Sequence, residues 1–431
     1  MKVFFDMVGC RLNQAEIEKM AAQFRAAGHE IVQTSHQADL VIINSCSVTA
    51  AAASDSRQKV RQAHKAGAGQ IVLTGCWATV SSQAARELPG VTQVFLNDEK
   101  ESIPQLLIRA DDLLHSLEPL ERKPLPGVHR RTRAFIKVQD GCDNHCTFCI
   151  TRVARGSSRS LLREEILREV QQAVAGGTHE VVLTGVNLGA WGRDNAGKAD
   201  LTGLVRYILT NSEVERLRLS SIEPWDMDED FLSLWEDRRM CRHLHIPLQS
   251  GCVETLKRMG RRTSTEQYRK LIHLVRTYLP DAAITTDIIV GFAGESDAEF
   301  DESLDFVREM KFAGGHVFRF SPREGTLAWD LPNRVNGLSA HTRSERMRQV
   351  LAESEKKFWC GFIGQQMDVL WESSKQMKNG CWHLHGLTGN YLPVSAEAPE
   401  DRWNMINKVS LEKVLTDSIA GIIISSGALG K

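Results

Sequence analysis

The sequence lacks an uninterrupted apolar run of about 18 residues, so no transmembrane helix is expected. It also lacks the pattern of a secretion signal, because Asp6 and Arg11 interrupt the apolar start of the chain. No charge sign dominates, since 53 Lys and Arg stand against 54 Asp and Glu, and net charge gives no support for general nucleic-acid binding. Ten cysteines in 431 residues are too few for a disulfide scaffold. We therefore expect a cytoplasmic protein with reduced thiols.

The charges are nevertheless unevenly distributed. Residues 121–163 hold ten basic and three acidic side chains, and residues 257–270 hold six basic and one acidic. Solvated helix faces would explain each run by itself. Together with the cysteine motifs described next, the two runs favour a surface that binds phosphates.

The alternation of apolar runs with amphipathic stretches predicts three domains. Residues 1–120 repeat strand, helix and strand, which predicts a doubly wound parallel α/β domain. Residues 128–360 contain six candidate strands with helical connections, which predicts a partial (β/α) barrel, with an open sheet as the alternative. Residues 361–431 hold only short strand-like segments, which predicts a small β-barrel. Three prolines in 118–128 mark a linker.

Three cysteines lie close together directly after the predicted strand 134–139. Cys142, Cys146 and Cys149 have the spacing C-x3-C-x2-C. Clustered reduced thiols suit an iron–sulfur cluster, because soft sulfur ligands bind iron. Zinc is the alternative, although it normally takes four protein ligands. Three thiolates on a four-iron cluster would leave one iron open for a substrate or cofactor.

Three further cysteines, Cys10, Cys46 and Cys76, each follow a predicted strand. The carboxyl ends of parallel strands share one edge of a sheet, so residues far apart in sequence can meet there. Core packing is the alternative, since cysteine is often buried. The location of all three where strands end favours a second metal site.

The motifs resemble those of the radical S-adenosylmethionine enzymes and, within them, the methylthiotransferases. The first cysteine loop, which holds Cys142, Cys146 and Cys149, carries the resemblance to the radical S-adenosylmethionine enzymes as a whole. The segments GCRLNQAE, NSCSVT and TGC, followed by RGSSRS, LTGVNLGAWG, HIPLQSG and TDIIVGFAGE, carry the narrower one. Ala293 stands where the family usually has proline, and Ile150-Thr151 where it usually has Ile-Pro. Neither departure removes a predicted cluster ligand.

The resemblance implies two 4Fe–4S clusters and S-adenosylmethionine. Cys142, Cys146 and Cys149 would hold the cluster that binds and reductively cleaves this cofactor, giving a 5′-deoxyadenosyl radical. Cys10, Cys46 and Cys76 would hold the cluster that carries the sulfur to be transferred. The C-terminal barrel would be a TRAM domain that binds RNA, although residues 361–431 hold six basic and seven acidic side chains.

The resemblance implies modification of threonylcarbamoyladenosine next to the anticodon of transfer RNA. The sequences after Cys10 and Cys46 and before Cys142 favour this branch of the family. Isopentenyladenosine in transfer RNA and an aspartate of a ribosomal protein are the alternative substrates. A non-enzymatic iron–sulfur RNA-binding sensor is the alternative outside the enzymes. As partners we expect transfer RNA, a reductase or flavodoxin-type electron donor, a sulfur donor, and no membrane.

Five residues outside the two cysteine sets are candidates for binding the cofactor. Gly185 and Asn187 end the predicted strand 179–185, where a ligand could approach the backbone closely. Ser221 and Glu223 end the predicted strand 216–222, and a carboxylate there could bind ribose hydroxyls, or be a surface acid. Arg155, in the basic run, could contact phosphates or the cofactor carboxylate.

Overall fold

The computed structural model describes residues 1–108, 132–194 and 200–424, so the linker predicted at 118–128 lies outside the described residues. The chain divides into two compact units, and each is described by itself. The first unit comprises residues 1–204, 210–213 and 321–329. The second comprises residues 205–209, 214–320 and those from 330 onward.

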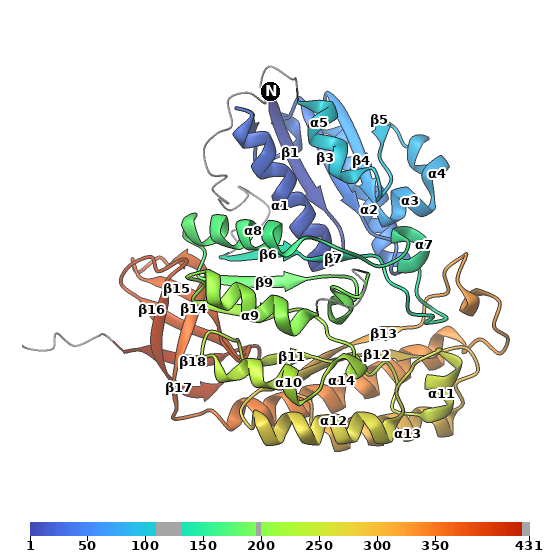
Figure 1. The fold of residues 1–431 in the computed structure, drawn as a ribbon, viewed down its shortest axis with the longest axis vertical. Helices are drawn as coiled ribbons and strands as arrows, with labels where there is room; N and C mark the ends of the chain where they lie inside the picture. The colour runs from blue at the N-terminus through green and yellow to red at the C-terminus, as the bar shows by residue number, and fades with distance from the viewer. Residues whose placement is uncertain (109–131, 195–199, 425–431) are drawn as a thin grey trace, which may run out of the picture. The chain divides into compact units, whose positions relative to one another are not determined.

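The first unit begins with a parallel five-stranded sheet of order β2-β1-β3-β4-β5, drawn in blue to cyan in Figure 1. Apolar side chains of the strands alternate between two cores. Ile42 packs with helix α1 and Ile43 packs with helix α2, on the opposite face. This confirms the predicted doubly wound arrangement. The elements are β1 (Lys2–Met7), α1 (Arg11–Ala26), β2 (Glu30–Ile31), β3 (Leu40–Ser45), α2 (Ala50–Lys65), β4 (Gln70–Gly75), α3 (Cys76–Val80), α4 (Ser82–Arg86), β5 (Val91–Val94) and α5 (Ile103–Leu107).

The same unit contains the first strands of the predicted barrel. Strands β6 and β9 pair in parallel, and helix α1 packs against β6 through a small core of Ala15, Phe135 and Val182. One helix therefore contacts both β1 of the N-terminal sheet and β6. The elements are β6 (Arg133–Lys137), β7 (Gln139–Asp140), α7 (Thr151–Arg155), β8 (Arg159–Ser160), α8 (Arg163–Ala175) and β9 (Glu180–Thr184). Helix α9 (Leu201–Asn211) follows, and its residues 205–209 are assigned to the second unit.

The second unit continues the alternation of strands and helices. Strands β11, β12 and β13 form a parallel sheet, and Figure 1 shows α12, α13 and α14 running along one side of it. Capping boxes at Ser264 and Ser296 fix the starts of α12 and α13. The elements are β10 (Arg216–Leu219), α10 (Glu229–Leu232), β11 (His243–His245), α11 (Val253–Arg258), α12 (Thr265–Tyr278), β12 (Ala283–Val290), α13 (Asp297–Met310), β13 (Gly314–Arg319) and α14 (Gly337–Cys360).

The chain ends in a closed barrel of order β14-β15-β16-β18-β17, which confirms the predicted small β-barrel. Its core surrounds the fully buried Trp371, whose indole N–H donates to Asn407 Oδ1 at 2.9 Å. Trp359 at the end of α14 joins this core. The strands are β14 (Gln366–Gln376), β15 (Trp382–Thr388), β16 (Pro393–Ala398), β17 (Ile406–Val414) and β18 (Ile419–Ile423).

Several details of the strand predictions differ from the structure, and two of them have a clear physical cause. Strand β5 was not predicted, because its sequence VTQV is short and half-exposed. One of the six candidate strands of residues 128–360 covers residues 243–249. In the structure it ends at His245, since Pro247 has no N–H to donate and Gln249 has a φ of 73°. In the described ranges, no helix combines the length and apolar character needed to cross a membrane.

Candidate iron–sulfur sites

Cys10, Cys46 and Cys76 converge at one edge of the N-terminal sheet. Cys10 precedes α1, Cys46 follows β3, and Cys76 is the first residue of α3, directly after β4. These strands are neighbours in a parallel sheet, so their carboxyl ends lie together. The convergence predicted from the sequence is therefore present.

Two glycines allow the chain to pack tightly around these cysteines. Gly9 has a φ of 111°, and a Cβ on it would lie 2.8 Å from Cys46 Sγ. Gly75 has a φ of 99°, and a Cβ there would collide with the Ser45 carbonyl. Only glycine tolerates both the close approach and the positive φ. The Gly-Cys pairs at 9–10 and 75–76 are thus a steric requirement of this edge.

The three thiols are near enough to influence one another. Cys10 is exposed as a residue, but desolvation of its thiol raises its pKa; the Arg155 guanidinium opposes this rise, and the Cys76 thiol adds to it. Burial also raises the pKa of Cys46 to about 11, with Cys10 and Cys76 adding to it. Thiols of this kind become good ligands only when a metal displaces their protons.

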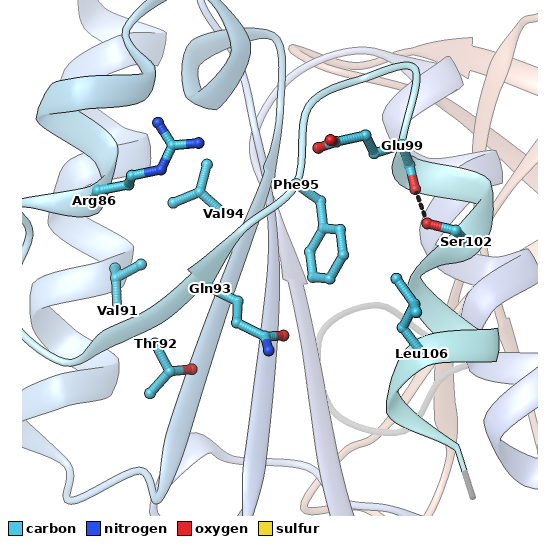
Figure 2. Close-up of a pocket in the computed structure, with 9 residues that line it drawn as sticks. All are labelled: Arg86, Val91, Thr92, Gln93, Val94, Phe95, Glu99, Ser102 and Leu106. Carbon is cyan, nitrogen blue, oxygen red and sulfur yellow. Dashed lines mark hydrogen bonds between the residues drawn. The ribbon is translucent and has the colours of Figure 1, made fainter.

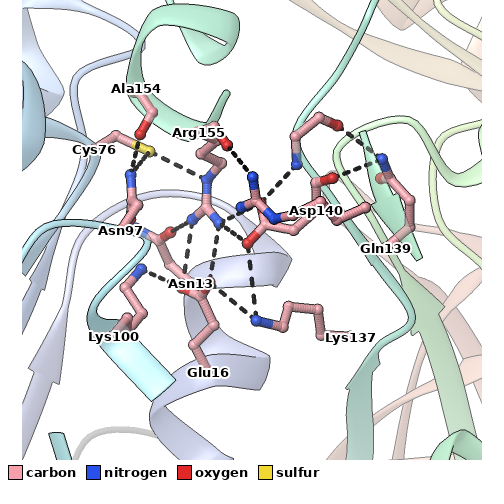
Figure 3. Close-up of polar contacts among 12 residues, drawn as sticks. Asn13, Glu16, Cys76, Asn97, Lys100, Lys137, Gln139, Asp140, Ala154 and Arg155 are labelled. Atoms are coloured by element: carbon pink, nitrogen blue, oxygen red, sulfur yellow. Dashed lines mark hydrogen bonds and ion pairs between the residues drawn. The ribbon is translucent and has the colours of Figure 1, made fainter. Parts of the chain in front are cut away.

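Arg155 is the polar centre of this site, and Figure 3 shows its contacts. The side chain is buried, with 4% of the residue exposed. Its Nε donates to Cys76 Sγ at 3.3 Å, and its Nη2 donates to Asn13 Oδ1 at 2.7 Å. Its Nη1 donates to Glu16 and Asp140, both at 2.9 Å. The cofactor contact predicted for Arg155 stays a prediction, and the described contacts already engage every guanidinium nitrogen.

Two further amides contact the cysteine sulfurs. Asn13 Oδ1 accepts from the Cys10 thiol at 3.9 Å. Asn97 Nδ2 approaches Cys76 Sγ at 3.7 Å and donates to the Ala154 carbonyl at 2.6 Å. Asn13 lies one helical turn after Cys10 on α1, so helical spacing from the cysteine is the signal that would have identified it.

Glu16 anchors a buried ionic network behind Arg155. Lys100 Nζ lies 2.7 Å from Glu16 Oε2, and Lys137 Nζ lies 2.6 Å from Glu101 Oε1. Burial alone would raise the pKa of Glu16, but Arg155, Lys100 and Lys137 outweigh it and hold this pKa well below its usual range. The carboxylate is therefore charged and paired. Sequence reasoning missed this network, because its members come from distant segments.

The first cysteine loop begins at a tight turn. Gly141 has a φ of 71°, and a Cβ on it would collide with the Ser157 carbonyl. Cys142 is buried and donates its N–H to Gly156, and its Sγ accepts from the Asn144 N–H at 3.4 Å. Cys146 and Cys149 are partly exposed. Backbone N–H groups aimed at sulfur are typical of thiolates that bind iron.

Gly185 and Asn187 lie beside this loop, and their predicted contact with the cofactor stays a prediction. Gln139 Oε1 accepts the Asn187 N–H at 2.9 Å, and Gln139 Nε2 donates to the Gly141 carbonyl at 2.7 Å. The Asn187 side-chain oxygen is buried and has no partner among the described residues. A buried acceptor without a partner fits a ligand that donates a hydrogen bond, as the amino group of S-adenosylmethionine would.

Ser221 and Glu223 belong to the second unit. Ser221 is exposed and forms an isolated parallel bridge with His245. The Glu223 carboxylate accepts two hydrogen bonds from Arg261, at 2.7 and 3.1 Å. This pair was not predicted, and it means that a ribose hydroxyl would share Glu223 with Arg261.

Within residues 1–108, 132–194 and 200–424, no three His, Cys, Asp or Glu side chains meet closely enough to surround a single metal ion. A four-iron cluster needs a wider arrangement, because each thiolate binds a different iron. The soft donors and the N–H groups around them fit such a cluster in both sets. That each set of three cysteines binds one such cluster stays a prediction.

A hollow of about 620 Å³ beside strand β5 is lined by other residues. Figure 2 shows Arg86, Glu99 and Leu106 around it, with Ser102 donating to the Glu99 carbonyl. None of the predicted site residues lines this hollow. It is therefore separate from both cysteine sets.

Comparison with known proteins agrees with this geometry. Residues 136–307 match the model of the Radical SAM superfamily, and residues 2–97 match that of the Uncharacterized protein family UPF0004. The fold and the cysteine loop thus define a radical S-adenosylmethionine protein, which implies this cofactor and one 4Fe–4S cluster. In fold, the chain resembles the radical S-adenosylmethionine methyltransferase TsrM from Kitasatospora setae, with a TM-score of 0.54 and 15% identity over 74% of this chain and 72% of that one.

Curated relatives narrow the class further. The chain is 33% identical to the threonylcarbamoyladenosine tRNA methylthiotransferase MtaB of Bacillus subtilis, over 96% of this chain and 93% of the relative. It is 36% identical to MtaB of Thermotoga maritima, over 86% of each chain. It is 30% identical to the tRNA-2-methylthio-N(6)-dimethylallyladenosine synthase of Maricaulis maris, over 99% of this chain and 98% of the relative. The chain belongs to the radical S-adenosylmethionine methylthiotransferase family.

Proposed function

We propose that this protein is a tRNA methylthiotransferase that adds a methylthio group to carbon 2 of N6-threonylcarbamoyladenosine next to the anticodon. The observation that carries the proposal is the identity of 33% and 36% to two MtaB enzymes over most of the chain. The presence of both cysteine sets in one compact unit supports it, because the reaction needs a radical source and a sulfur source.

We assign the first cluster to Cys142, Cys146 and Cys149. Gly185 and Asn187 would bind S-adenosylmethionine, since they lie beside the loop and the buried side-chain oxygen of Asn187 has no partner in the described part of the chain. For Ser221 and Glu223, the contact with a ribose that the sequence predicts stays a prediction. When S-adenosylmethionine is bound and reduced at the first cluster, it would supply a radical able to remove hydrogen from an aromatic carbon.

We assign the second cluster, which would hold the sulfur, to Cys10, Cys46 and Cys76. Their meeting at one sheet edge and the donors of Arg155 and Asn97 support a sulfur-rich anionic group at this place. The chain's own part is to hold the thiolates apart and to exclude water, because two of the three cysteines are buried.

The proposed reaction balances in atoms and electrons. One S-adenosylmethionine gives its methyl group to bound sulfide and becomes S-adenosylhomocysteine. The adenine C2–H bond breaks and a C2–S bond forms, which is a two-electron oxidation. A second S-adenosylmethionine is reduced by two electrons to methionine and 5′-deoxyadenosine, which takes up the hydrogen. The electron donor therefore starts each turnover without being consumed overall.

The remaining assignments complete the proposal. The three domains are 1–120, 128–360 and 361–431, and the closed C-terminal barrel binds RNA. The partners are transfer RNA, a reductase or flavodoxin-type electron donor and a sulfur donor. The location is the cytoplasm, where transfer RNA is found and thiols stay reduced.

Mass spectrometry of nucleosides from transfer RNA tests the proposal. Cells that lack this protein should lose the methylthio form of threonylcarbamoyladenosine and keep the unmodified form. Return of the signal with the intact gene, and not with Cys146→Ala, is the control. An unchanged amount of this nucleoside would overturn the proposal.

The second candidate substrate is dimethylallyladenosine. The 30% identity to the synthase of Maricaulis maris over 99% of this chain favours it. The same nucleoside analysis separates the two, because loss of the methylthio form of dimethylallyladenosine alone would select this candidate.

A further inference from the structure

Arg155 connects the two cysteine sets within the first unit. It ends helix α7, which follows the loop of Cys142, Cys146 and Cys149. Its guanidinium nevertheless donates to Cys76 of the other set, at 3.3 Å. The chain that leaves the first cysteine loop thus places a cation on the second set.

The contacts of Arg155 reach both sets through short bridges. Asp140, which accepts from Nη1 at 2.9 Å, stands two residues before Cys142. Asn13, which accepts from Nη2 at 2.7 Å, also accepts from the Cys10 thiol. A planar guanidinium with its donors engaged this way has one orientation, so its Nε–H is held toward sulfur.

A neighbouring cation in the same network, Lys137, has no described contact with either Cys76 or Asn13. The side chain of Lys137 is buried, and its Nζ lies 3.9 Å from Glu16 Oε1 and 3.8 Å from Asp140 Oδ2. Arg155 contacts the same two carboxylates at shorter distances. The described contacts of Lys137 are to carboxylates. Arg155 and Lys137 therefore share charge, burial and two acidic partners, and Arg155 alone of the two contacts Cys76 and Asn13.

We propose that Arg155 is a positioning residue for the second cluster: its Nε–H orients Cys76, and its charge raises the reduction potential of that cluster. This inference rests on the proposed second cluster. A cation and a hydrogen bond at a ligand sulfur stabilise the reduced, more negative form of a cluster. A purely structural Arg155 would join α1, β7 and α7 and leave the potential unchanged.

The test uses full-length protein that carries Cys142→Ala, Cys146→Ala and Cys149→Ala, so that only the second cluster can form. Iron content and an EPR-monitored redox titration are measured in this background, without a further change and with Arg155→Gln, Arg155→Lys or Lys137→Gln. A background protein that binds no iron would refute the proposed second cluster itself, before Arg155 is tested.

With Arg155→Gln we expect the protein to retain its iron. The equilibrium constant for reduction of the second cluster should fall about tenfold, which lowers the reduction potential by about 59 mV for one electron. Arg155→Lys should recover part of this shift, because it keeps the charge without the planar fork. Lys137→Gln should shift the equilibrium less than Arg155→Gln does. Equal shifts for Arg155→Gln and Lys137→Gln, or no shift for either, would overturn the proposal.

The main result of a second measurement comes from the background protein alone and does not depend on whether the Arg155 variants fold. The background protein with ¹⁵N-labelled arginine should show a ¹⁵N hyperfine coupling to the reduced cluster in pulsed EPR. The coupling should be absent in Arg155→Lys if that variant folds. No ¹⁵N coupling in the background protein would contradict the contact between Arg155 and the cluster.

Discussion

The two cysteine sets of the first unit differ in where their residues come from. Cys142, Cys146 and Cys149 lie in one short loop, with two of them partly exposed. Cys10, Cys46 and Cys76 come from three strand ends of one sheet and meet a buried ionic network. A loop can form its site locally, whereas a set built on a sheet depends on the whole domain. We therefore expect the first set to be sensitive to changes within its loop and the second to changes across the unit.

The largest effect should follow from changing the loop. Cys146→Ala removes a predicted ligand of the cofactor-binding cluster, so cleavage of S-adenosylmethionine should fall below detection. Iron at the second set should remain, because no contact of that set is lost. Methionine and 5′-deoxyadenosine are measured after reduction by dithionite. Retained cleavage would contradict the assignment of the loop.

Cys46→Ala should have the opposite pattern. The protein should lose the iron of one cluster and all methylthio product, while cleavage of S-adenosylmethionine continues without transfer. Iron analysis and the cleavage assay are run on the same preparation. Iron content equal to that of the unchanged protein would show that Cys46 is a core residue only.

Glu16→Gln tests how far the second set depends on its network. Leaving Arg155 and Lys100 without this carboxylate should lower the stability of the metal-free protein by about 3–5 kcal/mol at neutral pH. The pKa of Glu16 is held below its usual range in the fold, so its stabilising contribution exists above its unfolded pKa, about 4.3. It is lost as the pH falls further, through the folded pKa.

The measurement is chemical denaturation of the metal-free protein and of Glu16→Gln from pH 7 downward. The difference in the free energy of unfolding between the two proteins should be constant above pH 5 and should become smaller below about pH 4. A difference that is independent of pH throughout this range would contradict a charged, paired Glu16.

Two matched glycine substitutions test the two cysteine sets one at a time, because each introduces steric strain beside one set. Gly9→Ala places a methyl group against Cys46, and Gly141→Ala places one against the Ser157 carbonyl. Each change should destabilise by about 1–3 kcal/mol, because alanine disfavours positive φ. Gly9→Ala should lower iron at the second set, and Gly141→Ala should lower it at the first. Equal loss at both sets in either variant would show that the sites are not independent.

The smallest effect is expected for a cysteine outside both sets. Cys360 is exposed at the end of α14, and Cys360→Ser should change stability by less than about 0.5 kcal/mol. Iron content and cleavage should equal those of the unchanged protein. A loss of iron would mean that a seventh cysteine serves a cluster.

Much of the fold could be predicted because its strands are apolar and buried. The segments of β1, β3 and β4 have this character along most of their length. Strand β5 could not be predicted, since an exposed edge strand has no such pattern. The irregular path after His245 depends on Pro247 and on the positive φ of Gln249, which a strand pattern does not reveal.

The site divides in the same way. The meeting of Cys10, Cys46 and Cys76 follows from parallel strand order, which the sequence pattern indicates. The partners of Arg155 do not follow from strand order, because Glu16, for example, lies 139 residues away in the chain. Arg155 was identified as a candidate, but only the fold shows that its donors contact Cys76, Asn13, Glu16 and Asp140.

The most direct test of two separate clusters is iron per chain in three reconstituted proteins: the unchanged chain, Cys10/Cys46/Cys76→Ala and Cys142/Cys146/Cys149→Ala. The account predicts about eight iron atoms in the first and about four in each triple variant, as two 4Fe–4S clusters require. About four in the unchanged chain, with none in the variant of the loop cysteines, would contradict it.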